Sequence, residues 1–535
     1  MNPTLFEALG RQPYSAGLDV KPMPLYVGVD DTDSLRGMCT TFLATELVRA
    51  LSAWDLIGFP RLVRLNPNVP WKTRGNGAIC LRLGRGRGAR FIIGELEGRQ
   101  VWAYRRGDEV PIDALLIRIV QETVEAWSRF DDPTTNPAFI VLRRPPSPRL
   151  YWRAVRTLVK KEEALEAIGG LGLHREYKNG RGVIGAAAAA AWRPRDRTYE
   201  VLAYRRQDRW GTARRISRES VRRLDAAFPS TFNNYDWEDD RVVIAPRTPC
   251  PVLCGIRGDD PWELPVALAG LHGEVPDRWL LFETNQGTDD HVIENPAALE
   301  PRTSVSIVGT VMGPPRTVPG GHVVVRLRGR HEIDVLAYEP SKGFRAHVRA
   351  LASGDVVRVL GSIREEPRSL NLEKFELLAR ATVVAKVGNP KCPACTRRMK
   401  SAGRRGPYRC RRCGMERPQS DAIFAIRPRS ILPGWYEPPV GSRRHLSKPL
   451  KRMGEADTRK ESVVGRPSKR ASPKSRGAVP PPTTLDMETQ TPYKGRFVQS
   501  SNPRLAYPLA RRPARVARTS VSGAPRPGIR RVRST

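Results

Sequence analysis

The sequence predicts an α+β protein of several domains, and three observations support this fold class. The chain has 535 residues, 40% of them hydrophobic, whereas one domain usually takes about 150 residues. Residues 301–380 carry a series of strand-like segments with one helical segment among them, which is typical of a small β-barrel. Two Cys-x-x-Cys pairs follow and indicate a small metal-bound domain.

Basic residues dominate the charge of the chain. It has 91 Lys and Arg residues against 55 Asp and Glu residues, a formal net charge of +36, and such an excess usually matches a polyanionic partner. The longest uncharged apolar run, residues 183–192, is about half a membrane span, and the first residues lack a signal-peptide pattern. We therefore expect no membrane association. Because the cysteines lack disulfide-type spacing, we expect a reducing, cytoplasmic location.

An acidic turn follows the first predicted strand. The short apolar run LYVGV is followed directly by Asp30, Asp31 and Asp33, and leucines at four-residue intervals then predict a helix with Thr40 or Thr41 as its N-cap. Three carboxylates so close together repel one another unless a cation lies among them. Oxygen ligands favour Mg²⁺, which also binds nucleotide phosphates. A capping turn rich in Asp on the surface explains the same residues equally well.

A basic segment containing glycines comes next. Its cations are Arg61, Arg64, Lys72 and Arg74, and Asn76 lies between two glycines just before another predicted strand. Glycines let a backbone approach a ligand closely, and nearby cations balance the charge of phosphates. The motif GxxxxGK[ST] is absent from this segment, so it is not a P-loop. A tight hairpin with a solvated basic face is the alternative.

Two further segments carry weaker signals. The glycine-rich residues 178–185 run into the alanine series 186–191, which predicts a closely packed helix start and a candidate ligand contact, although tight packing alone explains it as well. One of the few acidic patches of the chain consists of Asp236, Glu238, Asp239 and Asp240. An acidic pocket beside a basic one favours a small cationic substrate. A solvated acidic loop is the alternative.

The barrel region contains five β-rich segments separated by turns. They are residues 304–311, 322–327, 331–338, 355–363 and 370–378, with a helical segment at 342–351. Three strands, a helix and two strands is the order of an OB-fold, a barrel that commonly binds oligonucleotides. The basic charge of the chain favours nucleic-acid binding here. Another five-stranded barrel without a ligand is the alternative.

Four cysteines indicate a zinc site. Cys392 and Cys395 form one Cys-x-x-Cys pair, and Cys410 and Cys413 form the other after fourteen intervening residues. Two such pairs place four thiolates around a tetrahedral zinc ion and leave no coordination position for a substrate. We therefore expect a structural zinc ribbon whose many basic side chains contact phosphates. A redox role of either pair is the alternative.

The last segment, residues 450–535, differs in composition from the rest of the chain. Residues 451–535 hold 20 Lys and Arg against 5 Asp and Glu, with frequent Pro, Ser and Gly and no strand or helix periodicity. Such a segment buries too little apolar surface to offset its ordering entropy, so we expect a disordered basic tail. We also expect this tail to add non-specific phosphate contacts.

A series of sequence blocks spans residues 25–449. In order they are GVDDTDSLRGMCTT, GFPRLVRLNPNVPWKTRGNGA, DDPTTNPAF, RGVIGA, PCPVLCGIRG, TNQGTDDHV, the two Cys-x-x-Cys pairs and RRHLSKP. Together these blocks resemble the archaeal 2-agmatinylcytidine synthetase family, which acts on the AUA-decoding isoleucine tRNA. The sequence departs from the family's pattern by an N-terminal extension, residues 1–23, and by the basic tail.

The resemblance implies four folded domains. They would be a kinase-like ATP-using α/β domain at 24–160, a ferredoxin-like domain at 161–282, an OB-fold at 290–386 and a zinc ribbon with a C-terminal segment at 387–449. The last two agree with what the residues predict on their own. The barrel and the zinc ribbon would bind the acceptor end of the tRNA, while the wobble base is flipped toward the ATP site.

The resemblance also implies an activity and its residues. In the family, ATP is consumed to AMP and phosphate, the C2 oxygen of the wobble cytidine of the CAU-anticodon isoleucine tRNA is phosphorylated, and agmatine displaces that phosphate. The product reads AUA codons. Carried over by position, Asp30, Asp31 and Asp33 would hold Mg²⁺, and Thr40 would be the residue that is autophosphorylated.

The remaining candidate residues have less specific roles. The resemblance associates Lys72, Arg74 and Asn76 with the phosphates of ATP, and the cations of the same segment add Arg61 and Arg64 as candidates. The guanidinium group of agmatine needs carboxylates, which the acidic patch could supply. Two other readings stay open: a non-catalytic RNA-binding protein without nucleotide turnover, and a metal-dependent nuclease that cleaves RNA without ATP. The sequence does not predict the oligomeric state.

Overall fold

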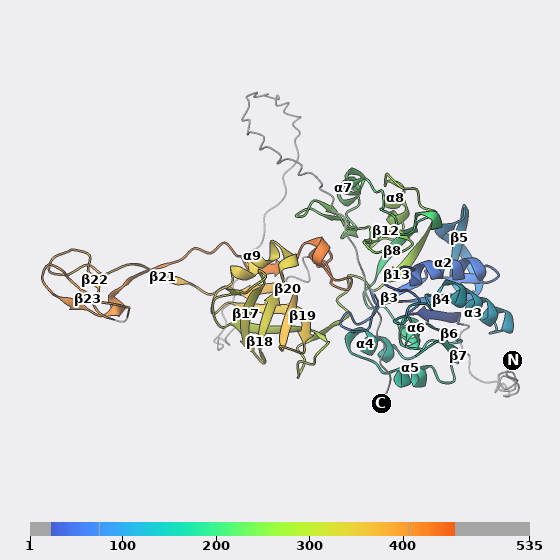
Figure 1. Ribbon diagram of the computed structural model, residues 1–535, viewed down its shortest axis with the longest axis horizontal. Helices are drawn as coiled ribbons and strands as arrows, with labels where there is room; N and C mark the ends of the chain where they lie inside the picture. The colour runs from blue at the N-terminus through green and yellow to red at the C-terminus, as the bar shows by residue number, and fades with distance from the viewer. Residues whose placement is uncertain (1–22, 74, 405, 455–535) are drawn as a thin grey trace, which may run out of the picture. The chain divides into compact units, whose positions relative to one another are not determined.

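The computed structural model describes residues 23–73, 75–404 and 406–454. The predicted N-terminal extension up to residue 22, Arg74, and the predicted tail beyond residue 454 lie outside the described residues. The described residues belong to one structural unit, Met1–Val464. They form a mixed α+β fold with one large sheet, a five-stranded barrel and a cysteine-bearing module (Figure 1). No helix of this part has the length and apolar character that a membrane crossing requires.

One 11-stranded sheet joins the two regions where separate kinase-like and ferredoxin-like domains are expected. Its path runs through β7 (Gly172–Glu176), β6 (Ala138–Leu142), β1 (Leu25–Asp30), β4 (Gly77–Leu96), β3 (Arg61–Arg64), β13 (Arg278–Thr284), β8 (Thr198–Tyr204), β12 (Val252–Gly258) and β9 (Thr231–Phe232), with β2 (Asp55–Ile57) and β5 (Arg99–Asp108) paired beside β4. Strand β13 pairs with both β3 and β4, so it connects the first half of the sheet to the second.

Helices cover both faces of the first half of this sheet (Figure 1). On one face lie α2 (Thr40–Ala50) and α3 (Ala114–Trp127), and on the other lie α4 (Pro148–Arg156), α5 (Lys161–Ile168) and α6 (Gly182–Ala191). Side chains of a strand alternate between faces, so Val27 belongs to the core under α2, and Tyr26 belongs to the core under α6. Gly28, between Val27 and Val29, lets α6 approach the strand closely, because a Cβ at this position would lie 2.6 Å from the carbonyl oxygen of Ala186.

Shorter elements complete the second half of the sheet region. They are α7 (Arg218–Ala227), β10 (Tyr235–Asp236), β11 (Arg241–Val242) and α8 (Glu263–Ala269). Strand β10 pairs with β11 in a two-stranded hairpin that stands apart from the large sheet. This hairpin carries the predicted acidic patch.

The predicted five-stranded barrel is confirmed. Its strands are β15 (Ser304–Val311), β17 (Val323–Gly329), β18 (Glu332–Ala337), β19 (Val356–Arg364) and β20 (Ser369–Ala379), and the helix α9 (Phe344–Arg349) lies between the third and fourth strands. The barrel closes because β15 pairs with both β17 and β19, and β20 pairs with both β18 and β19. Short strands β14 (Val292–Glu294), β16 (Arg316–Thr317) and β26 (Gly434–Tyr436) pair at its edges.

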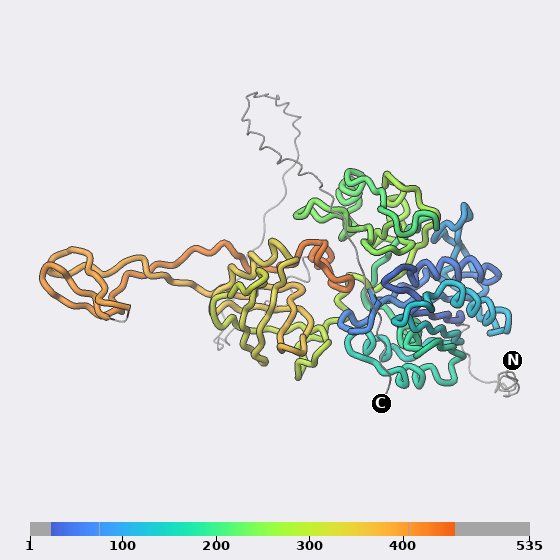
Figure 2. The backbone as a smooth tube through the Cα atoms, viewed as in Figure 1, coloured from blue at the N-terminus to red at the C-terminus, as the bar shows by residue number. Residues whose placement is uncertain are grey.

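The cysteine-bearing module is built on a two-stranded ribbon. The chain enters along β21 (Val384–Gly388) and leaves along β25 (Ile423–Ile426), and these strands pair antiparallel, as the orange segments of Figure 2 show. Between them, β22 (Lys400–Ser401), β23 (Tyr408–Arg409) and β24 (Glu416–Arg417) form a small three-stranded sheet. The module has a small core of its own that includes two of the four cysteines, Cys392 and Cys410.

Candidate active site

A cavity of about 510 Å³ brings together most of the residues that were predicted to bind Mg²⁺ or phosphate or to be autophosphorylated. The predicted residues that line it are Asp30, Asp31, Asp33, Thr40, Arg64, Lys72 and Asn76. They come from the end of β1, the start of α2, strand β3 and the loop that leads into β4. Segments more than a hundred residues further along the chain complete the wall, so the cavity exists only in the folded protein.

Asp30 and Asp31 form an acidic wall with poorly balanced charge. Asp30 is the last residue of β1, and burial, with the charge of Asp31, raises the pKa of its carboxyl group well above the usual value. Burial likewise raises the pKa of Asp31 to about 6, although the charge of Arg181 opposes the rise. Arg181 Nη2 lies 3.5 Å from Asp31 Oδ2. Carboxylates crowded in this way suit a divalent cation, which would favour their charged forms.

Asp33 is the third acidic residue at this wall. Its Oδ1 atom accepts a hydrogen bond of 2.7 Å from the hydroxyl of Thr73, and its carbonyl oxygen accepts one of 2.7 Å from Thr135. The bond from Thr73 ties the acidic turn to the basic segment, and Thr73 itself lines the cavity. The two motifs found separately in the sequence therefore form one structure.

The glycine-rich start of α6 is shaped around Asp30. A Cβ at Gly185 would overlap the Asp30 carboxylate, and a Cβ at Gly182 would lie 2.6 Å from the Asp30 carbonyl oxygen. Arg181, just before the helix, also donates a hydrogen bond of 3.3 Å to the carbonyl oxygen of Trp71. This segment therefore contacts the acidic wall directly, and its glycines are needed for the position of Asp30.

Thr40 lies at the start of α2 with its hydroxyl beside the acidic turn. The residue is buried, lines the cavity and accepts a hydrogen bond of 3.1 Å from the hydroxyl of Thr32. The prediction that Thr40 or Thr41 caps this helix is wrong, because the N-cap is Cys39. The backbone of Cys39 is still extended (φ −161°, ψ 132°), and Thr40 is already the first helical residue.

Arg61 and Arg64 face opposite sides of the sheet. Three positions apart on one strand, they must point to different faces. Arg64 lines the cavity. Arg61 is buried on the other face, where its guanidinium group donates a hydrogen bond of 3.3 Å to Ala190 and lies over the ring of Trp192. The structure thus separates Arg61 from Arg64, Lys72 and Asn76, the described members of the predicted phosphate-binding set.

Lys72 and Asn76 lie in the loop between β3 and β4. Lys72 Nζ donates hydrogen bonds to the carbonyl oxygens of Pro67 (2.5 Å) and Val69 (3.4 Å). Asn76 has a left-handed backbone (φ 47°), and its amide donates a hydrogen bond of 2.9 Å to the carbonyl oxygen of Asn66. Both residues are therefore held on the rim of the cavity by the loop itself.

The acidic patch lies elsewhere, and three of its four carboxylates have hydrogen-bond or ion-pair partners. Asp236 is buried and accepts a hydrogen bond of 2.8 Å from the backbone of Gly441. Asp240 forms ion pairs with Arg218 and Arg222. Asp239 lies 3.8 Å from Lys342 Nζ, and the Glu238 carboxylate lies against Gly343. None of the four is among the described residues that line the cavity.

Several cavity residues were not predicted from the sequence. Glu200, Arg257 and His445 line the cavity together with Thr248 and Cys250. Cys250 and Arg257 lie in the block PCPVLCGIRG and His445 lies in RRHLSKP, but neither block by itself indicates this cavity. Pairing of β8, β12 and β13 brings Glu200 and Arg257 to it, and a hydrogen bond from Gly287 to the carbonyl oxygen of His445 holds the C-terminal segment there.

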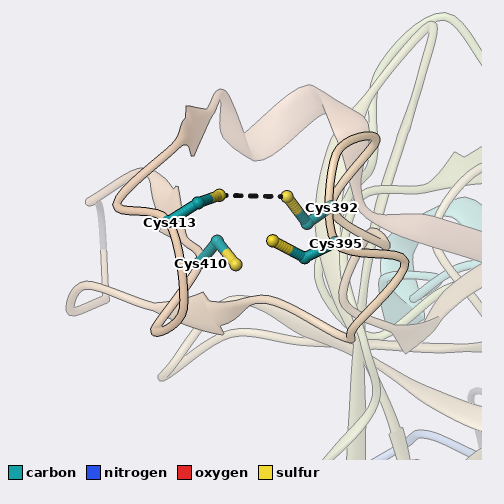
Figure 3. Close-up of side chains that lie close together, drawn as sticks. All are labelled: Cys392, Cys395, Cys410 and Cys413. Carbon is teal, nitrogen blue, oxygen red and sulfur yellow. Dashed lines mark hydrogen bonds between the residues drawn. The ribbon is translucent and has the colours of Figure 1, made fainter.

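The four cysteines converge as the spacing predicts (Figure 3). Their Sγ atoms lie within 4.8 Å of one another, and those of Cys392 and Cys413 are 3.5 Å apart. Tetrahedral zinc with Zn–S distances of about 2.3 Å requires sulfur atoms about 3.8 Å apart. The arrangement therefore fits a zinc ion held by four thiolates, with no position left for a substrate.

Family models match three parts of the chain. They are described as the TiaS TCKD domain (residues 26–179), the TiaS FLD domain (180–291) and the TiaS C-terminal zinc ribbon domain (389–431). The chain is 37% identical to the isoleucine-tRNA 2-agmatinylcytidine synthetase TiaS of Methanocaldococcus jannaschii, over 80% of this chain and 98% of that protein. It is 39% identical to the protein of the same name from Archaeoglobus fulgidus, over 81% and 98%.

Solved structures agree with these sequence relationships. The chain resembles the crystal structure of TiaS in complex with an isoleucine tRNA and ATP, with a TM-score of 0.70 and 37% identity over 81% of this chain and 98% of that one. It resembles a TiaS complex with the tRNA, AMPCPP and agmatine with a TM-score of 0.67 and 35% identity over the same shares. Because relatives above 30% identity cover most of its length, the chain belongs to the TiaS family of isoleucine-tRNA 2-agmatinylcytidine synthetases.

Proposed function

We propose that this protein uses ATP to join agmatine to C2 of the wobble cytidine in the CAU-anticodon isoleucine tRNA, so that the tRNA reads AUA codons. The observation that carries the proposal is the cavity, which combines the carboxylates of Asp30 and Asp31, the hydroxyl of Thr40 and the basic loop around Asn76. Phosphoryl transfer needs these features, because catalysis depends on positioned phosphates and on balancing their charge.

The proposed chemistry explains why ATP is required. The C2 carbonyl of cytosine is a poor electrophile because oxide is a poor leaving group. Phosphorylation of the C2 oxygen converts it into a phosphate leaving group, which the primary amine of agmatine then displaces. The conversion of ATP to AMP releases two phosphoryl groups. One leaves with the C2 oxygen, and the other takes the oxygen of a water molecule.

The acidic wall is the proposed Mg²⁺ site. Asp30, Asp31 and Asp33 would hold the ion, and the raised pKa values of Asp30 and Asp31 support this fit, since they reflect burial and negative charge that Arg181, among the described residues, balances only in part. Bound there, Mg²⁺ supplies charge neutralisation to nucleotide phosphates. We further propose that the hydroxyl of Thr40 accepts a phosphoryl group in autophosphorylation. Its position at the cavity wall beside the acidic turn supports this role.

The basic loop is the proposed phosphate-binding region. Arg64, Lys72 and Asn76 line the cavity and would contact the phosphates of ATP. Arg61 would act only through the packing of the opposite face of the sheet. The acidic patch is a less direct candidate for agmatine, because its carboxylates are already paired outside the cavity.

We assign the barrel as an OB-fold and propose that it binds the tRNA together with the zinc ribbon. The strand pairing of the barrel, with the helix α9 between its third and fourth strands, is the order expected of that fold. Basic side chains around the four cysteines suit contacts with phosphates. The two earlier regions, 24–160 and 161–282, would be the kinase-like and ferredoxin-like domains, joined here by one sheet.

One assay tests the proposed function. The protein is incubated with a transcript of the CAU-anticodon isoleucine tRNA, ATP and labelled agmatine, and the products are analysed for AMP, labelled tRNA and shortened RNA. We expect AMP and labelled tRNA. Binding without turnover would identify an RNA-binding protein, and cleaved RNA without ATP would identify a nuclease. Asp30→Ala should abolish incorporation while tRNA binding stays nearly unchanged.

A further inference from the structure

The cavity has a second charged wall, opposite in sign to the acidic one. Arg64, Arg257 and His445 all line it, and they come from β3, from β12 and from the segment that follows the cysteine-bearing module. Of these three residues, only Arg64 has a role in the proposed function, as a contact of the ATP phosphates. The contacts of these three residues indicate a more specific task.

Arg64 is held against the glycines of the basic loop. A Cβ at Gly75 would collide with its guanidinium group, and a Cβ at Gly77 would lie 3.0 Å from its Nη1 atom. These glycines are therefore required for the position of Arg64. Its Nε atom is buried without a hydrogen-bond partner within the described ranges. Burial lowers the pKa of this guanidinium group, Glu200 opposes the change, and Arg257 adds to it.

Arg257 is fixed on the same wall by an ion pair. Its Nε atom donates a hydrogen bond of 2.9 Å to Glu200, which in turn accepts one of 2.5 Å from Gln286. Glu200 is thus shared between Arg257 and an amide, and Asp33 also acts on Arg64 through its charge, with a smaller effect than Glu200. Because the charge of Glu200 is divided among several partners, an anion can further neutralise the two guanidinium groups of this wall.

His445 adds a third donor from a distant part of the chain. The residue lines the cavity with an accessible side chain, and its ring lies 3.8 Å from the position of a Cβ at Gly75. Its carbonyl oxygen accepts a hydrogen bond of 2.8 Å from Gly287, and the preceding Arg444 donates one of 2.7 Å to Asn68. These bonds fix the segment. Burial, with the charges of Arg64 and Arg257, lowers the pKa of His445 well below its usual value, so the ring is neutral and offers one N–H group.

We propose that Arg64, Arg257 and His445 form a subsite for a phosphate dianion, and that this subsite holds the phosphoryl group on the C2 oxygen while agmatine attacks. The inference rests on the proposed function. Guanidinium groups match the oxygens of a phosphate geometrically, and donors aimed at a leaving group stabilise the charge that develops on it. The acidic wall and the metal would serve the nucleotide, and Arg257 and His445 would serve the transferred phosphate. Arg64 would contact this phosphoryl group both in ATP and after its transfer.

The step that the subsite assists can be written completely. The neutral primary amine of agmatine forms a bond from nitrogen to C2, and the bond between C2 and its oxygen breaks. The electron pair of that bond stays with the oxygen, which leaves as part of the phosphate. One amine proton passes to the departing phosphate, giving hydrogen phosphate. The step consumes no further ATP and needs no additional reactant.

The experiment separates phosphorylation from displacement. Wild-type enzyme and Arg257→Met are first incubated with the tRNA and ATP labelled in its β- and γ-phosphates, and the label on the tRNA is measured. Agmatine is then added, and loss of the label and formation of the product are followed. We expect Arg257→Met to form AMP and labelled tRNA within about threefold of wild type, and to lose the label to agmatine about 10²-fold more slowly.

A second set of variants addresses folding and charge. His445→Phe should slow displacement by about tenfold, and His445→Asn, which keeps an N–H donor, should recover most of the rate. Arg197→Met removes an arginine that pairs with Glu283 outside the cavity, and should leave both steps unchanged. If Arg257→Met does not fold, the two His445 variants decide the question.

The outcomes distinguish the subsite from the proposed function. Displacement at the wild-type rate in Arg257→Met and His445→Phe would overturn the subsite, and so would an equal fall of phosphorylation and displacement, since these residues would then serve the nucleotide. If wild-type enzyme forms neither AMP nor labelled tRNA, the proposed function itself is wrong.

Discussion

Two acidic clusters of similar composition differ in what balances their charge. At the cavity, burial and neighbouring carboxylates raise the pKa values of Asp30 and Asp31, and Arg181 compensates only in part. In the acidic patch, Asp240 has two arginine partners and a lowered pKa, with the hydrogen bond from Tyr235 as the main cause. A run of carboxylates therefore does not by itself identify a cation site. The candidate site is the cluster whose charge the surrounding protein leaves unbalanced.

The largest difference between the clusters should appear when one charge is removed from each. We expect Asp31→Asn to lower the rate of agmatine incorporation at saturating tRNA by about 10³-fold, because a ligand of the metal-nucleotide site is lost. Asp240→Asn should stay within about twofold of wild type. The affinity for tRNA should be unchanged in both. A comparable loss of activity in Asp240→Asn would mean that the patch belongs to the catalytic machinery.

The second prediction perturbs the acidic wall without removing a charge. In Gly185→Ala, the new methyl group overlaps the Asp30 carboxylate, so that the carboxylate must move. We expect incorporation to fall by about 10²-fold, since displacement of a positioned group by about 1 Å has effects of this size. Gly313→Ala is the matched control, because nothing lies within 4 Å of its added Cβ. Wild-type activity in Gly185→Ala would show that the position of Asp30 is not critical.

The parts of the molecule that the sequence predicted well depend on local spacing. The four cysteines need only two short turns, so their spacing determines the cluster. Strand alternation and turn residues likewise predicted the five barrel strands to within one or two residues of the observed bounds. The same alternation, applied to residues 61–64, would have separated Arg61 from Arg64, because positions of opposite parity face opposite sides of a strand.

The rest of the site depends on topology that no local pattern contains. Glu200, Arg257 and His445 come from three segments, and they meet Arg64 only because β13 links β3 to β8 and the C-terminal segment returns to the sheet. Whether the charge of a carboxylate is balanced also depends on residues that are distant in the sequence. The partners of Asp240 are Arg218 and Arg222, eighteen or more residues away, so the sequence could not show that the patch is neutralised.

A third buried carboxylate sharpens the comparison, because its pKa is raised mainly by burial although it does not line the cavity. Asp290 is buried, accepts a hydrogen bond of 2.5 Å from the hydroxyl of Tyr151, and burial raises its pKa from 3.8 to about 6. The folded state therefore binds this proton more tightly than the unfolded state. The resulting stabilisation is complete below pH 3.8 and is lost as the pH rises through about 6.

Thermal unfolding of Asp290→Asn tests this difference. The variant keeps an acceptor for Tyr151 and does not titrate at this position. The stability of wild type relative to the variant should therefore fall between about pH 4 and about pH 7, by on the order of 1.4 kcal/mol for each unit of the pKa difference. A difference in Tm that does not change with pH would contradict the raised pKa of Asp290.

The smallest expected effect concerns the basic residues at the end of the chain. The basic residues beyond position 454 should add phosphate contacts without touching the chemistry, so deletion of 455–535 should weaken tRNA binding most at low salt and leave the rate at saturating tRNA unchanged. Each lost phosphate contact lowers the slope of log affinity against log salt by about 0.7 to 0.9.

The deletion must begin after residue 454, because Lys451 donates a hydrogen bond of 2.7 Å to Thr231 and Arg452 pairs with Asp196 and Asp259. A deletion from residue 451 would remove these bonds, which anchor the segment that carries His445. An unchanged salt slope in the shorter deletion would mean that the tail does not contact the tRNA.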